Sequence, residues 1–214
     1  MGRIKEIAIY MKLQYTEGWK IMGIDVKEWL NREGEAFLED IGIKKGDVVL
    51  DFGCGDGPYT IPAAKVVREE GKVYAMDKDL ESMHKLMEIA KTKGLKNIIP
   101  LHTKSEELKI NLESESIDAV LLYDVIHYME ALGRKRIYEE IYRILKTGGL
   151  LSVYPKHRKS DEPLGNLSDM ELDDVIEEIN SSHFYLQEKF YKKLLHNNNY
   201  NTGYILNFRK KLNK

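Results

Sequence analysis

Short apolar runs alternate with segments of helical spacing through most of this chain. From Asp47 onward, runs of strand length recur between stretches whose apolar residues repeat every three or four positions. The runs predict strands at 48–52, 72–76, 97–101, 117–123 and 150–154. The periodic stretches predict helices over about residues 58–71, 79–93 and 134–146. Repeating strand–helix units are typical of a parallel sheet covered by helices.

The two ends of the chain depart from this alternation. Before it, apolar spacing predicts helices over about residues 3–14 and 26–40, the second interrupted near Gly34. After it, β-like runs at 184–191 and 203–209 with an asparagine-rich join predict a hairpin.

A further helix is expected before the hairpin, because Ser168 with Glu171 forms a capping-box pattern. With 214 residues the chain is long enough for one α/β domain with a sizeable core. We therefore predict an N-terminal helical cap region at residues 1–44 and one domain at residues 45–214. The domain is expected to be α/β, with a doubly wound, mostly parallel sheet.

The strand at 48–52 leads into three glycines at alternate positions, Gly53, Gly55 and Gly57. Glycine has no β-carbon, so a backbone can turn sharply there and a ligand can touch it. The next strand ends in an acid, Asp77, which can accept hydrogen bonds from a ribose diol. Together these features indicate a nucleoside-binding crevice at the carboxyl ends of parallel strands.

The spacing of the glycines distinguishes two kinds of nucleoside ligand. A dinucleotide fold favours a third glycine three positions after the second, where a pyrophosphate meets a helix N-terminus. Here Gly57 lies only two positions after Gly55, and Pro58 follows. The acid before the loop, Asp51, fits an ammonium or sulfonium group better than phosphate. A nicotinamide-dependent oxidoreductase stays the minority alternative, because an acid like Asp77 also occurs in NAD-binding proteins.

Four segments in this order resemble the motifs of class I S-adenosylmethionine-dependent methyltransferases, in the ubiquinone-methyltransferase-like group. The segments are 48–57, 73–77, 118–128 and 145–151. The resemblance implies a Rossmann-like seven-stranded sheet, mostly parallel with a reversed C-terminal strand, and S-adenosyl-L-methionine as cofactor.

The resemblance also implies roles for single residues. The loop glycines would lie against the methionine and ribose portions, Asp77 would hold the ribose hydroxyls, and Asp51 would position the amino end. The full set of implied cofactor-binding residues is Asp51, Gly53, Cys54, Gly55, Gly57, Asp77, Lys78, Ser105, Glu106, Asp124, Val125 and His127.

The third motif departs from the family pattern. It commonly offers an aspartate to the adenine amino group, and Lys104 stands at that position. Lysine cannot accept a hydrogen bond. Ser105, Glu106 or a backbone group is therefore expected to replace it at the edge of the adenine.

Methyl transfer from a sulfonium is an in-line displacement, so orientation and exclusion of water are the main tasks of the enzyme. A general base is needed only where the acceptor arrives protonated. His127 and His157 are the candidate catalytic residues, and a packing histidine and a solvated loop histidine are the alternatives. Tyr15 and Trp19 could cover the cofactor or pack in the core. No cluster of side chains at metal-ligand spacing is evident, so no metal is expected.

Composition and charge limit the classes of binding partner that the sequence favours. A net charge of −2 gives no global attraction to nucleic acid or anionic membrane. Acids gather at 161–178 and bases at 184–214, either as solvated faces or as a weak docking patch. The single cysteine, Cys54, excludes an internal disulfide, and no apolar run approaches the ~18–20 residues that span a bilayer. We predict a cytoplasmic protein.

Three classes of function follow. The first is a methyltransferase with a small-molecule acceptor, and its close variant acts on RNA or protein through the basic C-terminal hairpin. The second is an S-adenosylmethionine-binding module without turnover, and the third is the oxidoreductase. Neither the acceptor nor an oligomeric state is indicated by the residues.

Overall fold

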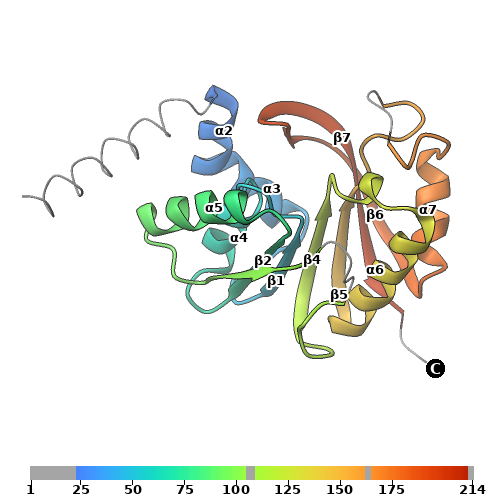
Figure 1. The fold of residues 1–214 in the computed structure, drawn as a ribbon, viewed down its shortest axis with the longest axis horizontal. Coiled ribbons are helices and arrows are strands. Elements are labelled where there is room, and N and C mark those ends of the chain that lie inside the picture. Colours follow the sequence, from blue (N-terminus) through green and yellow to red (C-terminus); the bar gives the residue numbers. More distant parts are fainter. Residues whose placement is uncertain (1–22, 105–108, 162–164, 212–214) are drawn as a thin grey trace, which may run out of the picture.

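The computed structural model describes residues 23–104, 109–161 and 165–211 (Figure 1). A seven-stranded sheet has the order β3-β2-β1-β4-β5-β7-β6. β7 runs antiparallel to both of its neighbours, and the pairs among β1 to β5 are parallel. The strands are β1 Val48–Phe52, β2 Lys72–Asp77, β3 Ile98–His102, β4 Ile117–Tyr123, β5 Leu145–Tyr154, β6 Phe184–His196 and β7 Asn199–Lys210. The predicted fold class, including the reversed last strand, is confirmed.

Helices cover both faces of the sheet (Figure 1). They are α2 Ile24–Glu28, α3 Gly34–Asp40, α4 Thr60–Val67, α5 Leu80–Thr92, α6 Ala131–Ile144 and α7 Leu172–Asn180. β4 shows how two cores arise: Leu121 packs with α3, α4 and α5, whereas Val120 packs with α6 and α7. Successive strand residues point to opposite faces, so a central strand covered on both sides is apolar at nearly every position.

The order of the strands creates a switch point between β1 and β4. The chain builds β1, β2 and β3 outward in one direction and then returns to place β4 on the other side of β1. Helices that follow β1 and β4 therefore lie on opposite faces, and their carboxyl ends leave a crevice. The loop after Phe52 and the turn after Tyr123 meet there.

The predicted interruption of the N-terminal helix near Gly34 is wrong. A π-helical turn, Trp29–Glu33, joins α2 to α3, and the helix continues through Gly34. A β-carbon at Gly34 would lie 2.6 Å from Pro62 Cγ, so glycine is needed for the close packing of α3 on α4. The described part of the predicted cap region shares one core with the sheet through Trp29 and Leu38. The domain boundary near residue 44 stays a prediction, and the predicted helix at 3–14 lies outside the described residues.

Three helix boundaries also differ from expectation. α4 is shorter than 58–71, and α6 ends at Ile144 because β5 begins at once, where Leu145 pairs with Ile117. The capping box of α7 is formed by Glu171 and Asp174, one turn later than the expected Ser168 and Glu171. Such local shifts are common, since tertiary pairing competes with local capping preferences.

The C-terminal hairpin is longer than the sequence indicated. β6 and β7 pair as far as His196 and Asn199, leaving a two-residue turn of Asn197 and Asn198. Both asparagines have positive φ, 48° and 62°, as a hairpin turn of this length favours. The tip of the hairpin reaches α2 (Figure 1), where Tyr200 N donates to the Asp25 carboxylate at 2.8 Å. No helix within the described ranges is long and apolar enough to cross a membrane.

Candidate functional site

The glycine loop after β1 is anchored to β2 and left open on its other side. The amides of Gly53 and Cys54 both donate to the Met76 carbonyl, at 2.8 and 3.0 Å. Gly53 has a φ of 78°, and a β-carbon there would lie 2.2 Å from Val125 Cγ2. Gly55 has a φ of 50°, yet no described atom lies within 4 Å of where its β-carbon would be. The backbone at Gly55 can therefore be approached closely by a ligand.

Asp77, at the end of β2, lies directly against this loop. Its carboxylate accepts hydrogen bonds from the backbone amides of Gly55, at 2.7 Å, and Asp79, at 2.9 Å. An ionised carboxylate has about four lone-pair positions, so capacity remains for two further donors. The structure thus brings together Asp77 and the glycine loop, as the sequence predicted.

Asp51 is buried below the loop, with 3 % of its surface exposed. Thr60 Oγ1 donates to its carboxylate at 2.5 Å. Burial raises the pKa of Asp51 to about 7, and the nearby negative charge of Asp77 adds to this, while the Thr60 hydrogen bond opposes it. A cation placed above the loop would favour the ionised form.

The remaining predicted loop residues differ in accessibility. Cys54 is buried, and burial raises the pKa of its thiol far above the ordinary range, which disfavours a nucleophilic role. Lys78 is exposed beyond Asp77. Ser105 and Glu106, predicted at the adenine, and Tyr15 and Trp19 lie outside the described residues.

On the other side of the crevice, three histidines surround Asp124, the residue after β4. Asp124 Oδ1 lies 3.5 Å from His127 Nδ1 and 3.4 Å from His157 Nε2, and Oδ2 lies 2.7 Å from His196 Nδ1. The three imidazoles are almost fully buried, whereas 25 % of the Asp124 side chain is exposed. Val125, which packs on Gly53, joins this cluster to the glycine loop.

Two residues of the cluster have an unusual backbone conformation. Asp124 has a φ of 55° and His157 a φ of 63°, in the left-handed region that residues with a β-carbon rarely adopt. They follow the paired ends of β4 and β5, where Tyr123 is in register with Tyr154 and the Asp124 amide donates to the Tyr154 carbonyl. Backbone strain of this kind persists where the surroundings hold it, and it is frequent at functional sites.

His127 is the histidine whose protonation is most strongly affected. Burial lowers its pKa to about 4, and His157 and His196 lower it further, while the charge of Asp124 opposes them. His127 is therefore a neutral imidazole at physiological pH. It can act as a ligand or a hydrogen-bond partner, but its low basicity makes it a poor proton acceptor.

The sequence missed several members of the site. His196 lies at the end of β6 and reaches Asp124 only because the hairpin returns beside β5. Tyr59 and Tyr123, with ring centroids 4.7 Å apart, form an aromatic wall behind the loop, and Tyr59 donates to the Leu195 carbonyl at 2.6 Å. The absence of a metal-ligating cluster was expected from local spacing, yet the fold groups Asp124, His127 and His157.

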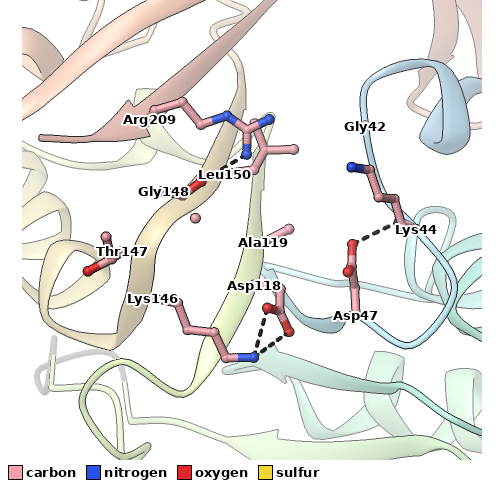
Figure 2. A pocket seen from close by; sticks show the side chains of 11 residues that line it. Gly42, Lys44, Asp47, Asp118, Ala119, Lys146, Thr147, Gly148, Leu150 and Arg209 are labelled. Carbon is pink, nitrogen blue, oxygen red and sulfur yellow. Dashed lines mark hydrogen bonds and ion pairs between the residues drawn. The ribbon is translucent and has the colours of Figure 1, made fainter.

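A separate shallow pocket of about 190 Å³ lies at the opposite ends of the strands (Figure 2). Lys146 Nζ bonds both carboxylate oxygens of Asp118 there, at 2.7 and 2.8 Å, and Asp118 also accepts from the Val48 amide. Six residues of β4 at about 3.3 Å each separate Asp118 from Asp124 by ~20 Å. The basic residue of the 145–151 motif is therefore structural and lies away from the site.

The fold and the site are similar to those of one class of protein. Residues 49–149, just under half of the chain, match the family model described as a methyltransferase domain. The seven-stranded sheet, the switch-point crevice and the loop anchored beside Asp77 agree with this match and indicate the class I S-adenosylmethionine-dependent type of that domain. S-adenosyl-L-methionine is the cofactor that this class of domain indicates.

Individual proteins that are similar to this chain in sequence or fold are also methyltransferases. The chain is 30 % identical to the sterol 24-C-methyltransferase of Saccharomyces cerevisiae over 131 residues, 55 % of this chain and 33 % of that protein. It is 31 % identical to the demethylmenaquinone methyltransferase of Staphylococcus aureus, over 58 % of this chain and 48 % of that one. A crystal structure of a S-adenosylmethionine-dependent methyltransferase from Aquifex aeolicus has the same fold, with a TM-score of 0.68, 23 % identity and coverage of 91 % and 96 %.

The alignments with the two curated relatives cover only part of those proteins. The chain spans a third to a half of the length of the two curated relatives.

Proposed function

We propose that this protein transfers the methyl group of S-adenosyl-L-methionine to a small molecule. One observation carries the proposal: the Asp77 carboxylate and the open backbone of Gly55 are hydrogen-bonded to each other at the switch point, inside the matched domain. A nucleoside ligand could donate its ribose hydroxyls to the Asp77 carboxylate and contact the backbone of Gly55 at the same place.

The loop and its two acids would bind the donor. The free capacity of Asp77 suits the two ribose hydroxyls, and the exposed backbone at Gly55 suits close contact with the methionine portion. Asp51, buried beneath the loop, would offer negative charge to the cationic end of the donor, directly or through water. Lys78, Cys54, Asp124, Val125 and His127 line the same crevice in this proposal, and Ser105 and Glu106 are proposed at the adenine.

The reaction requires little covalent chemistry from the protein. A lone pair of the acceptor forms the new bond to the methyl carbon while the carbon–sulfur bond breaks, and the sulfonium keeps the electron pair as a neutral thioether. Holding acceptor and methyl group in line supplies most of the acceleration, since effective molarities of well-aligned groups reach about 10⁵ M or more. We assign His127 and His157, which lie beside Asp124 after β4, to orienting the acceptor.

A small-molecule acceptor is favoured by the relatives. The names of the two curated relatives specify a sterol and a demethylmenaquinone, which are small molecules. The ubiquinone-methyltransferase-like subgroup and a cytoplasmic location belong to the same proposal.

RNA or protein is the competing acceptor class. The hairpin bears Tyr191 and Tyr204 with ring centroids 4.9 Å apart, and Lys189 lies over the Tyr204 ring. Exposed aromatic rings beside lysines are suited to single-stranded nucleic acid.

Incubation with radiolabelled methyl donor and fractionated cell extract tests the proposal. We expect the label in the small-molecule pool. Label in the RNA or protein pool would favour the competing class. Tight binding of S-adenosylhomocysteine without label in any pool would indicate a binding module without turnover.

A further inference from the structure

Half of the histidines in this chain converge on one carboxylate. The chain has six histidines, and His127, His157 and His196 surround Asp124. The four residues come from four different places: Asp124 follows β4, and the histidines lie in the 3₁₀ turn Ile126–Tyr128, in the loop after β5 and at the end of β6. Such convergence from distant segments depends on the fold and not on local helix or strand spacing.

The distances within the cluster match those of a coordination sphere. Asp124 Oδ1 lies 3.5 Å from His127 Nδ1 and 3.4 Å from His157 Nε2. Ligand atoms about 2.0–2.1 Å from a zinc ion at tetrahedral angles lie about 3.3–3.4 Å from one another. One ligand atom from each of Asp124, His127 and His157 lies within 4.8 Å of the others.

Several polar atoms of the cluster are buried without a hydrogen bond. Among the described residues, Asp124 Oδ1, His127 Nδ1 and His196 Nδ1 have no hydrogen-bond partner, although each is inaccessible to solvent. Native proteins leave few buried polar atoms unsatisfied, and an ion is one of the ordinary explanations. Asp124 Oδ1 faces His127 Nδ1 at 3.5 Å, and His196 Nδ1 faces the other carboxylate oxygen of Asp124 at 2.7 Å.

The backbone at two residues of the cluster is left-handed. Asp124 and His157 both have positive φ, 55° and 63°. Aspartate and histidine adopt this conformation more often than most residues with a β-carbon, so its cost here is modest.

We propose that Asp124, His127 and His157 bind one divalent transition-metal ion of the zinc class. Two imidazoles and one carboxylate form a ligand set suited to such ions, with one position left open. His196 acts as a positioning residue, because it holds the second carboxylate oxygen of Asp124 at 2.7 Å. Asn197 Nδ2 lies 3.1 Å from His196 Nε2 and fixes the outer edge of that ring.

The site would lie beside the donor pocket, since Val125 separates Asp124 from the glycine loop by one residue and packs on Gly53. An acceptor hydroxyl or thiol at the open position would lose its proton to solvent more readily and then attack the methyl carbon. This role rests on the proposed function, whereas binding of the ion does not.

Competition of the full chain with a chromophoric chelator for Zn²⁺ tests the proposal. We expect one ion per chain and a loss of affinity of about 100-fold or more in His157→Asn, because a ligand is removed. Asparagine tolerates positive φ, so this variant should keep the fold. His183→Asn is the matched control, since His183 also has a positive φ, 68°, but is exposed and directly precedes β6, whose other end carries His196. It should bind Zn²⁺ like the unmodified chain.

His196→Ala separates positioning from ligation. We expect a 10- to 100-fold weaker affinity with an unchanged stoichiometry. Co²⁺ in place of Zn²⁺ should give the intense visible absorption of low coordination number, lost in His157→Asn. Equal Zn²⁺ affinity of the unmodified chain and of His157→Asn would overturn the proposal. So would an unmodified chain that binds Zn²⁺ no more tightly than a double variant carrying His183→Asn and Asp124→Asn.

Failure of the metal site and failure of the proposed function are distinguishable. Calorimetric binding of S-adenosylhomocysteine to the metal-free chain reports on the donor site and does not require the ion, because its ribose contacts are assigned to Asp77. A chain that binds this ligand but not Zn²⁺ refutes the metal site and leaves the donor site intact.

Discussion

Two carboxylates below and beside the glycine loop have different surroundings. Asp77 is half-buried and accepts two backbone amides, whereas Asp51 is fully buried and receives one hydroxyl. Burial raises the pKa of Asp51 to about 7, so its charge is sensitive to what lies above the loop. A positively charged donor would favour the ionised form and thereby couple its binding to release of a proton.

Asp51→Asn should change how the stability of the ligand-free protein depends on pH. The folded pKa of Asp51, about 7, is raised above the unfolded value of ~3.9. Between about pH 4 and 7 the folded state therefore holds a proton that the unfolded state has released. The free energy of unfolding falls through this window by up to ~1.4 kcal/mol per pH unit, and the penalty is complete above pH 7. Asparagine removes this contribution.

Urea denaturation at pH 5, 6, 7 and 8 without donor measures the effect. The variant should gain stability relative to the unmodified chain as the pH rises, because other titrating groups are common to both. Parallel stability curves over this range would contradict the burial argument for Asp51.

Asp77→Ala should weaken binding of the donor and of S-adenosylhomocysteine. Hydrogen bonds to a charged group contribute about 1.5–3 kcal/mol, so loss of the ribose contacts corresponds to a drop of ~10- to 100-fold in affinity. The side chain is at a strand tip, so the fold should persist. Isothermal titration calorimetry measures the drop, and Asp173→Asn, at an exposed position on α7, is the control. An unaltered affinity of Asp77→Ala for S-adenosylhomocysteine would contradict the assignment of Asp77 to the donor site.

At the scale of elements, one ion pair fastens α7 to α6. Arg134 is buried on α6, and its guanidinium bonds both carboxylate oxygens of Glu178 on α7, at 2.8 and 2.7 Å. Tyr138 donates to the same carboxylate at 3.1 Å. The helices beneath the loop that carries His157 are thus joined by a planar, two-point contact.

Glu178→Ala should destabilise the protein strongly, because it leaves the buried Arg134 charge without its partner. A loss of about 3 kcal/mol is expected. Glu70→Ala is the matched control, since the Lys45–Glu70 pair is more than half exposed on both sides, at 54 % and 56 %. Denaturant midpoints should fall for Glu178→Ala and stay unchanged for the control. Equal midpoints for both variants would show that the α6–α7 contact contributes little.

At the scale of the whole molecule, the terminal hairpin closes the site. It pairs with β5, carries His196 to Asp124, and reaches α2 through the Tyr200 amide and Asp25. Residues more than 170 positions apart thereby stabilise one crevice. The sheet, its two helical layers and the hairpin act as one frame for the loop after β1.

Donor binding should therefore stabilise the whole chain. S-adenosylhomocysteine at ~100 times its dissociation constant contributes about 2.7 kcal/mol. For a domain of this size that corresponds to a rise of roughly 5–10 °C in the unfolding midpoint. Thermal scans with S-adenosylhomocysteine and with NAD measure it, and Asp77→Ala should show a smaller rise. A larger rise with NAD would restore the oxidoreductase alternative.

Local patterns determined much of this protein. The strand at 117–123, the helix that begins after Asp79 and the loop from Gly53 to Gly57 lie as the sequence predicted. Each depends on neighbours a few positions apart: a continuous apolar run, a cap, or the lack of a β-carbon. The order of such segments sufficed for the fold class and for the pairing of the loop with Asp77.

Tertiary structure alone decided the rest. His196 reaches Asp124 only through the return of the hairpin, 72 positions further along the chain, and Asp118 holds Lys146 across a strand pair. Gly34 lies in a helix and leaves room for Pro62 to pack against it, which no nearby residue reveals. Contacts between segments distant in sequence leave no periodic trace in the amino acids, so the histidine cluster and the burial that sets the charge of Asp51 became visible only in the folded chain.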